Sequence, residues 1–501
     1  MKRGKNKKSS KKKIINEPIE SEVQKAEKKS GFCNISRLLR DNLYVQLLLV
    51  LTVIAIFLRF YHLDFNSLWL DEAFTYNASS ASMLDIWELM KSGDFHPPLF
   101  HWIEHVMLMF GNTEFILRFV PALLGVATVP LFYLFGREVS DERVGILSAA
   151  LLTFSPFHIF YSQEAYSYSA VLFVFTLAII FYVKAIRDNS RKDWIIFGII
   201  SALCFWVHFY TIIPVAVLFL HAVLTKIVNF KSDIHELKRI VESGLIFIIF
   251  ISPLIFIVIE RYFTLTARPP TYGVLGPALI LESFTRFSSF NTFLAVVFLI
   301  LFVLGVVPLW RNSKSTFLLF LMLITLPFLI SVLLSARMTM NPRYLIYLLT
   351  VFYTGIACSY TWIQHLNPRK WIILGLIIAI MCVNLPSLLA YYQNLTKEDW
   401  RTYTHTIAEN TKNGDFIVLV PPYLNLPFNY YYKNSTDGTI QFGATNSKEL
   451  ETILQMKANN SIYYIVTADI TAANPEGDAF KWLQENARFA GSYTNIYTFI
   501  S

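Results

Sequence analysis

The sequence contains a long succession of apolar segments that are each about as long as a membrane is thick. A helix needs roughly 20 consecutive apolar residues to cross a bilayer. Eleven segments fit, at residues 43–61, 119–136, 144–161, 168–186, two within 194–228, then 242–262, 292–310, 316–335, 344–363 and 371–390. Only 16% of the residues are charged, against about 25% in soluble domains. The sequence therefore predicts a polytopic α-helical membrane protein with about eleven transmembrane helices.

Positive charge is concentrated before the first apolar segment. Residues 1–41 hold 13 Lys or Arg and 5 Asp or Glu, so their surplus equals the net charge of the whole chain, +8. This composition predicts a disordered cytoplasmic tail that could touch anionic membrane lipid. No aromatic residue interleaves with the basic run 1–13, which disfavours nucleic-acid binding.

The short loops between the apolar segments set the expected orientation. Segment 99–110 is too short to cross a bilayer, and we expect it to form a helix along the outer interface. With eleven spans and a cytoplasmic tail, the Lys- and Arg-rich short loops then fall in the cytoplasm, as the positive-inside rule requires. The transmembrane domain would occupy residues 42–391, with a first outer loop at 62–117.

The composition changes after the last apolar segment. Short β-rich runs at 416–420, 462–466 and 496–500 alternate with polar helical stretches. This alternation predicts a small extracytoplasmic α/β domain at residues 392–501.

An adjacent carboxylate pair, Asp71 and Glu72, stands in an apolar and aromatic setting just after the first span. Acids are favoured in the first turn of a helix, which is one explanation of the pair. Ionised groups near a membrane are costly unless they are used or paired, so we favour a reaction centre. A carboxylate placed there can take a proton from an acceptor hydroxyl.

Other polar residues are expected on the same outer side. His96 precedes two prolines that could simply start the interfacial helix, and the Tyr161–Tyr166 turn is either a hydrated loop or a ligand for sugar hydroxyls or a cation. Two arginines at span ends could reach lipid headgroups or bind a phosphate bidentately. These candidates for donor or acceptor binding are His96, Arg118, Tyr161, Gln163, Glu164, Arg343 and Tyr344.

A competing motif lies within segment 99–110. His101, Glu104 and His105 match the H-x-x-E-H pattern, in which two histidines hold zinc and the glutamate acts as a base. No third ligand follows in a comparable helix, and such short matches are usually accidental. A membrane zinc peptidase is therefore the third-ranked alternative.

Together, these motifs resemble the GT-C membrane glycosyltransferases, and more narrowly the family 39 type that includes protein O-mannosyltransferases and the lipid A aminoarabinose transferase. The resemblance is carried by Leu-Trp-Leu-Asp-Glu-Ala at 68–73, His-Pro-Pro-Leu at 96–99, Arg118 to Gly125, Tyr161 to Ala165 and Arg343-Tyr344. One departure is Tyr166, where the family often has arginine.

The resemblance implies a polyprenyl-phosphate sugar donor, an extracytoplasmic cleft and inversion at the anomeric carbon. It implies Asp71 as the general base and Glu72 as a support of the same site. Glu164 would bind sugar or acceptor, and Arg118 and Arg343 would hold the carrier phosphate.

No cofactor is required by this chemistry, although Glu164 could hold a divalent cation with Asp71 or Glu72. The acceptor could be a protein, a lipid or a glycan. The alternative from another class is a transporter or flippase for a lipid-linked sugar, because many spans with buried charges also fit transporters.

Overall fold

The computed structural model describes residues 42–92, 96–228, 234–265, 270–363, 369–432, 438–457 and 460–501. The chain divides into two compact units, residues 1–50 and 51–501. The described part of the first unit is the beginning of helix α2, Leu43–Phe60. The predicted tail, residues 1–41, lies outside the described residues.

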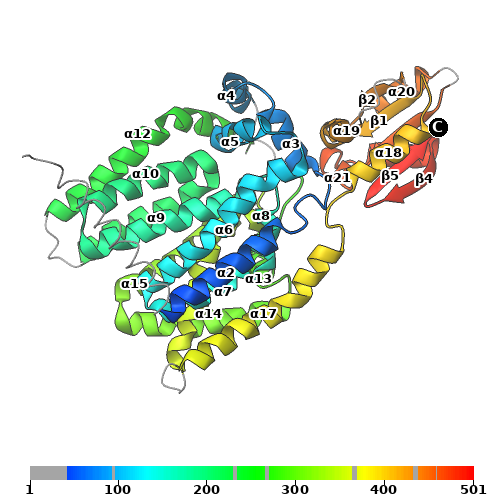
Figure 1. Ribbon diagram of the computed structural model, residues 1–501. Helices are drawn as coiled ribbons and strands as arrows, with labels where there is room; N and C mark the ends of the chain where they lie inside the picture. The colour runs from blue at the N-terminus through cyan, green and yellow to red at the C-terminus, as the bar shows by residue number, and fades with distance from the viewer. Residues whose placement is uncertain are drawn as a thin grey trace, which may run out of the picture. The chain divides into compact units, whose positions relative to one another are not determined.

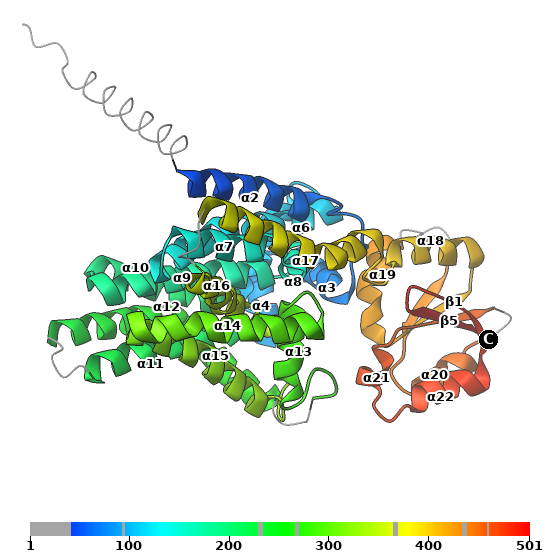
Figure 2. The ribbon, with the colours of Figure 1, turned by 90° about the horizontal axis from the view of Figure 1, so that it is seen from below.

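All of the apolar segments predicted to span the membrane fall on helices (Figures 1 and 2). These helices are α2, α6 (Glu114–Val139), α7 (Glu142–Thr153) with α8 (Pro156–Ser162), α9 (Tyr168–Asp188), α10 (Arg191–Val207), η1 (Phe209–Thr211) with α11 (Ile212–Val228), α12 (Ile234–Leu265), α14 (Thr292–Asn312), α15 (Lys314–Leu334), η2 (Pro342–Leu348) with α16 (Leu349–Cys358) and η3 (Ser359–Trp362), and α17 (Arg369–Gln393).

Among the described residues, nine helices are long and apolar enough to cross a membrane. Helices α7 and α8 would form a tenth span, bent by 62° between them. Helix α10 has 17 residues, about 26 Å at 1.5 Å per residue, which is slightly shorter than a typical hydrocarbon core. The eleven predicted spans thus correspond to nine full-length helices, a bent pair and one short helix.

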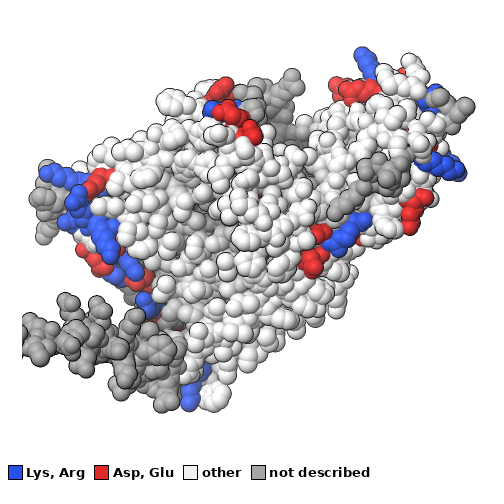
Figure 3. All heavy atoms as spheres, turned by 45° about the horizontal axis from the view of Figure 1, so that its top comes forward, with Lys and Arg blue, Asp and Glu red and all other residues white. Residues whose placement is uncertain are grey.

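A broad face of the molecule carries no charged side chains, and these gather instead near its margins (Figure 3). Apolar side chains on α2, α12 and α14 are exposed, among them Val53, Phe256 and Phe293. Such a surface is stable in lipid but not in water. The protein is a multi-pass membrane protein.

Helices α14 and α16 approach each other closely at Gly305. A Cβ atom added to Gly305 would lie 1.8 Å from the carbonyl oxygen of Gly355. Small residues allow two membrane helices to pack backbone to backbone. Gly305 therefore fixes the distance between these two helices.

Among the described residues before the C-terminal region, four short helices lie outside the spans: α3 (Leu70–Ser79), α4 (Met83–Ser92), α5 (Pro98–Leu108) and α13 (Ala278–Phe287). Helix α5 coincides with the segment predicted as an interfacial helix, and Pro98 is its first residue. Proline suits this position because its missing N–H would have no helical partner there.

The C-terminal region is a five-stranded mixed sheet in the order β2-β1-β3-β5-β4. The strands are β1 (Phe416–Val420), β2 (Ile440–Gly443), β3 (Ile462–Val466), β4 (Arg488–Tyr493) and β5 (Ile496–Ile500), and the helices are α18 (Trp400–Asn410), η4 (Pro422–Leu424), α19 (Asn425–Tyr431), α20 (Ser447–Gln455), α21 (Ile470–Ala473) and α22 (Asp478–Asn486). The three strands predicted from sequence lie at the predicted residues, whereas β2 and β4 were missed.

Helices cover both faces of this sheet, as Figure 2 shows for α18 on one side and α20 and α22 on the other. Alternate residues of β1 supply the two cores. Phe416 and Val418 pack in the cluster that contains Leu450 of α20, while Ile417 packs in the cluster that contains Trp400 of α18. Burial on both faces explains why β1 is a continuous apolar run.

Candidate functional site

The carboxylate pair lies in the first turn of α3, where the positive end of the helix dipole favours acids. Adjacent helical residues point about 100° apart, so the two side chains face different surroundings. The side chain of Glu72 is fully buried, whereas that of Asp71 is 22% exposed. The pair therefore contains one enclosed and one accessible carboxylate.

Glu72 is surrounded by hydrogen-bond donors. Arg118 binds it bidentately, with Nε 2.7 Å from Oε1 and Nη2 2.8 Å from Oε2. The N–H of Ala165 donates to Oε1 at 2.8 Å, and Lys397 Nζ lies 3.0 Å from Oε2. Burial alone would raise the pKa of Glu72, but the positive charges of Arg118 and Lys397 outweigh it and lower the pKa to about 2.

Arg118 is fully engaged by the protein. Besides Glu72, its guanidinium donates to three backbone carbonyls: Nη1 to those of Leu63 and Asn66, each at 2.8 Å, and Nη2 to that of Ser67 at 3.1 Å. A guanidinium has five N–H donors, and these five bonds use all of them. Arg118 thus ties the segment that precedes α3 to helix α6.

Asp71 pairs with a different arginine. Arg343 Nη1 lies 2.9 Å from Asp71 Oδ2. The guanidinium also lies over the rings of Trp69 and Tyr168, each 5.5 Å away, and of Tyr344 at 5.7 Å. Aromatic faces stabilise a cation without using its N–H groups, so Arg343 keeps donors that Arg118 does not have. Its Nε has no hydrogen-bond partner.

Glu164 is a third carboxylate in this cluster. Its side chain is 1% exposed, and its Oε1 lies 3.5 Å from Lys397 Nζ. Neither of its carboxylate oxygens accepts a hydrogen bond. Burial raises the pKa of Glu164 to about 7, and Lys397 acts in the opposite direction. A buried carboxylate without hydrogen bonds is costly, so this group is suited to receive a ligand hydroxyl.

Lys397 is the residue that the sequence analysis missed. It lies between α17 and α18, its side chain is 5% exposed, and it bridges Glu72 and Glu164. Its ammonium group also lies over the rings of Trp69 and Phe160. One signal was available: a lysine just beyond the predicted outer end of a span departs from the positive-inside rule.

Gln163 and Tyr161, both predicted to bind a ligand, make contacts within the protein. Gln163 Nε2 donates to the carbonyls of Arg59 at 3.1 Å and Tyr61 at 2.8 Å, which are orphaned at the end of α2. Gln163 Oε1 accepts from the Tyr391 hydroxyl at 2.7 Å. Tyr161 is buried and packs edge-on against Phe157.

The remaining predicted residues, His96 and Tyr344, lie in a cluster of aromatic side chains. His96 Nε2 is hydrogen-bonded to the hydroxyl of Tyr166, the residue found where an arginine was expected. Tyr344 stacks on Tyr210 with ring centroids 4.9 Å apart. These rings bring His96 and Tyr344 to the neighbourhood of Tyr168, which contacts Arg343.

The zinc-type motif lies on α5 and faces α3. His105 Nδ1 is 2.9 Å from the carbonyl of Ser79, and His101 Nδ1 is 3.4 Å from its hydroxyl. Glu104 is fully buried, and burial raises its pKa well above the usual range. In the part of the chain that the structure describes, no three His, Cys, Asp or Glu side chains are placed to hold a metal.

Comparison with known sequences matches part of the chain. The family model for dolichyl-phosphate-mannose-protein mannosyltransferases matches residues 95–257. An uncharacterized protein of Aquifex aeolicus is 32% identical over 162 residues, 30% of this chain and 31% of that protein. The undecaprenyl phosphate-alpha-4-amino-4-deoxy-L-arabinose arabinosyl transferase of Wigglesworthia glossinidia brevipalpis is 27% identical over 202 residues, 37% and 36% of the two chains. The matches thus span about a third of these relatives.

Comparison with solved structures covers nearly the whole chain. ArnT from Cupriavidus metallidurans bound to undecaprenyl phosphate aligns over 90% of this chain and 97% of that one, with a TM-score of 0.57 at 12% identity. The apo oligosaccharyltransferase of Archaeoglobus fulgidus aligns over 92% and 74%, with a TM-score of 0.58 at 12% identity. The chain therefore shares its fold with these two solved proteins. The resemblance inferred from the motifs is confirmed, and so is the polytopic helical fold with a C-terminal sheet.

Proposed function

We propose that the protein is a GT-C glycosyltransferase that moves a monosaccharide from a polyprenyl-phosphate donor to an acceptor on the extracytoplasmic side. Its partial likeness to an undecaprenyl-phosphate-dependent arabinosyl transferase and to the mannosyltransferase family model supports this class. The observation that carries the mechanism is the contrast between Asp71, partly exposed beside Arg343, and Glu72, enclosed by donors.

Asp71 is the general base in this proposal. The acceptor O–H gives its proton to the Asp71 carboxylate while its oxygen bonds to the anomeric carbon of the sugar. The bond from that carbon to the phosphate oxygen breaks, and the polyprenyl phosphate leaves with the electron pair. Attack opposite the leaving group inverts the anomeric carbon. Glu72 cannot replace Asp71, because its oxygens already accept from Arg118, Lys397 and a backbone N–H.

Arg343 is the cation that stabilises the leaving phosphate. Its guanidinium is held by aromatic faces and its side chain is 15% exposed, so it can bind phosphate in a charge-assisted bond. Arg118 receives a different role from the one expected from the motif. With all five N–H groups bound by the protein, it acts as the positioning residue that holds Glu72 and the start of α3.

Glu164 binds a hydroxyl of the donor sugar. Its two oxygens lack hydrogen bonds, and its pKa, raised by burial to about 7, leaves a substantial ionised fraction at neutral pH. The ionised carboxylate would accept a hydrogen bond from the sugar. Charge compensation comes from Lys397 and Arg343, so the proposal does not require a metal, although a cation held by Glu164 and Asp71 would be compatible with it.

Membranes that contain the protein provide the test. They are incubated with a panel of radiolabelled undecaprenyl-phosphate sugars, and the label is followed into protein, lipid and glycan fractions. We expect transfer from one donor, and a loss of about 10²–10⁴-fold in Asp71→Asn, as is typical when a general base is removed. Asp85→Asn is the matched control, because Asp85 is an exposed acid in the first turn of α4.

Two results would contradict the proposal. Normal transfer by Asp71→Asn would remove Asp71 as the base. Movement of the intact lipid-linked sugar across the bilayer, without transfer to any acceptor, would favour the transporter alternative instead.

A further inference from the structure

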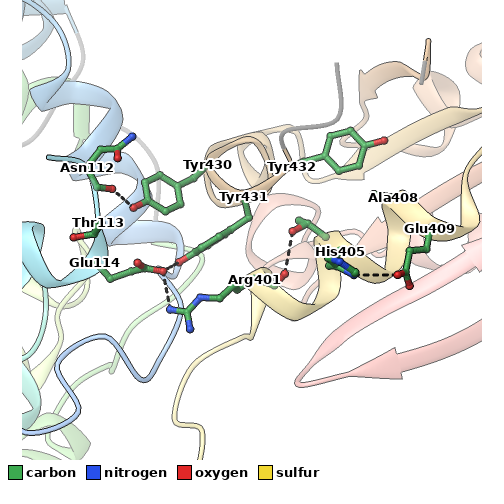
Figure 4. Close-up of a pocket in the computed structure, with 11 residues that line it drawn as sticks. Asn112, Thr113, Glu114, Arg401, His405, Ala408, Glu409, Tyr430, Tyr431 and Tyr432 are labelled. Atoms are coloured by element: carbon green, nitrogen blue, oxygen red, sulfur yellow. Dashed lines mark hydrogen bonds and ion pairs between the residues drawn. The ribbon is translucent and has the colours of Figure 1, made fainter. Parts of the chain in front are cut away.

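A pocket of about 650 Å³ lies apart from the carboxylate cluster, where the C-terminal domain meets the start of α6. Helix α18 supplies one wall, the tyrosines at the end of α19 supply another, and residues 112–114 close the side nearest the membrane domain (Figure 4). The volume is within the usual range of ligand sites, about 300–1,000 Å³.

The arginine of the pocket is already paired with a carboxylate. Glu114 Oε1 lies 2.7 Å from Arg401 Nη2 and also accepts from the Tyr431 hydroxyl at 2.7 Å. His405 Nδ1 lies 3.4 Å from Glu409 Oε1. Among the lining residues Arg401 is the one Lys or Arg, and its pairing leaves no unmatched cation for a phosphate or a carboxylate.

The remaining lining chemistry is aromatic and neutral polar. Tyr430, Tyr431 and Tyr432 follow one another along the chain, and asparagine and threonine side chains lie beside them. Ala408 is the one aliphatic residue of the lining, so the apolar surface comes mainly from tyrosine rings and from the carbon stems of polar side chains. Aromatic faces with hydroxyl and amide groups suit a neutral ligand that has both apolar C–H faces and many hydroxyls.

We propose that this pocket binds a neutral saccharide segment of the acceptor. The proposal deepens the transferase function and rests on it, because it makes the acceptor a sugar-bearing molecule that is held at a second place outside the reaction centre.

The pocket is connected to the reaction centre through the segment before α3. The Tyr431 hydroxyl accepts the N–H of Leu68 at 2.7 Å, and Arg401 Nη2 donates to the carbonyl of Asp64 at 2.9 Å. Glu114 precedes Arg118 by one helical turn, and Arg118 binds the same segment at Leu63, Asn66 and Ser67. A saccharide in the pocket would therefore contact Tyr431 and Arg401, the side chains that bond the segment before α3.

Binding is measured on the full chain in lipid nanodiscs by saturation-transfer NMR and titration. The probes are α-mannotriose and triacetylchitotriose, with inorganic phosphate as the anionic probe. We expect at least one trisaccharide to bind, and Tyr432→Ala to weaken that binding about tenfold, in line with the loss of one aromatic contact. His405→Ala should weaken it as well, and because the His405 side chain is exposed, its removal should leave the fold intact. Tyr423→Ala is the matched control, an exposed tyrosine on η4 outside the pocket.

Several outcomes overturn the proposal: binding of neither trisaccharide, binding of phosphate in their place, or binding that both pocket variants leave unchanged. Asp71→Asn separates the two proposals. If it binds trisaccharide normally and fails to transfer, both stand. If it transfers normally while Tyr432→Ala still binds weakly, the general-base mechanism fails and the pocket remains. If Asp71→Asn fails to transfer and the pocket variants bind as the unaltered chain does, only the pocket proposal fails.

Discussion

Replacing Lys397 with methionine is expected to shift the pH dependence of transfer. The ammonium group lies 3.5 Å from Glu164 and 3.0 Å from Glu72 in a nearly closed site. Glu72 keeps its bidentate partner Arg118 when Lys397 is removed. Glu164 loses its nearest cation, so the main consequence falls on its charge.

The size of the effect follows from Coulomb's law. At 3.5 Å and an effective dielectric constant of about 20, two unit charges attract by about 5 kcal/mol. Water and the other charges of the cluster screen part of this, and we expect the pKa of Glu164 to rise by at least about one unit, where one unit corresponds to about 1.4 kcal/mol. The sign is fixed: Lys397 lowers the pKa that burial raises to about 7, so its removal moves the pKa further upward.

The assay is kcat/KM for transfer between pH 5.5 and 9.5 with the donor identified in the membrane experiment. If ionised Glu164 binds the sugar, activity rises with pH through about 7 in the unaltered chain and at a distinctly higher pH in Lys397→Met. Lys397→Arg keeps the positive charge and is the matched control. Thermal unfolding of each variant checks that the fold is retained.

The reasoning would be refuted by a Lys397→Met profile that coincides with that of the unaltered chain. It would also be refuted if Lys397→Arg shifted as far as Lys397→Met, because the shift would then come from packing and not from charge.

Three further predictions concern roles that the structure distinguishes. Arg118→Lys should lower stability by about 1–3 kcal/mol, because an ammonium cannot replace the bidentate bonds to Glu72 and the bonds to the backbone carbonyls. Arg343→Lys should unfold nearly as the unaltered chain does and slow transfer; equal thermal midpoints for the two would contradict this. Gly305→Ala should cost about 1–3 kcal/mol through overpacking against α16, while Gly375→Ala, a helical control with nothing within 4 Å of the added Cβ, should be neutral or slightly stabilising. Gln163→Leu should cost about 1–3 kcal/mol by leaving the buried carbonyl of Arg59 at the end of α2 unbonded, and an unchanged midpoint would argue against this capping role.

The sequence was sufficient to predict the parts of the fold that depend on local pattern. Apolar length marks the spans because every backbone group in lipid must be satisfied within a helix. Helix α10 shows the limit of this reasoning. Its apolar run was recognised in the sequence, but its 17 residues are slightly too few to cross a typical hydrocarbon core. In the C-terminal domain, β1 and β3 were found since they are buried runs, whereas β4, exposed along most of its length, carries no such signal.

Several residues that the sequence motifs singled out lie close together in the structure, but the motifs did not show how each of them is held. The motifs predicted that Asp71, Arg118 and Arg343 lie on the same outer side. A motif does not show how many N–H groups of an arginine are hydrogen-bonded within the folded protein. Arg118 and Arg343 look alike in sequence, and only their acceptors distinguish them. Lys397 comes from a segment more than 300 residues away from Glu72, and such a contact has no local signature.

The C-terminal domain is linked to the candidate site by hydrogen bonds as well as by the chain itself. The hydroxyl of Ser67 donates to the carbonyl of Glu398 at 2.6 Å and accepts the N–H of Trp400 at 3.0 Å. On its other side the same segment is held by Arg118. The residues just before α3 are thus held from two sides. The orientation of the Asp71 side chain in the first turn of α3 therefore depends on both the membrane domain and the C-terminal domain. Lys397 belongs to this junction, so the domain that would choose the acceptor also supplies a charge to the site where the acceptor would react.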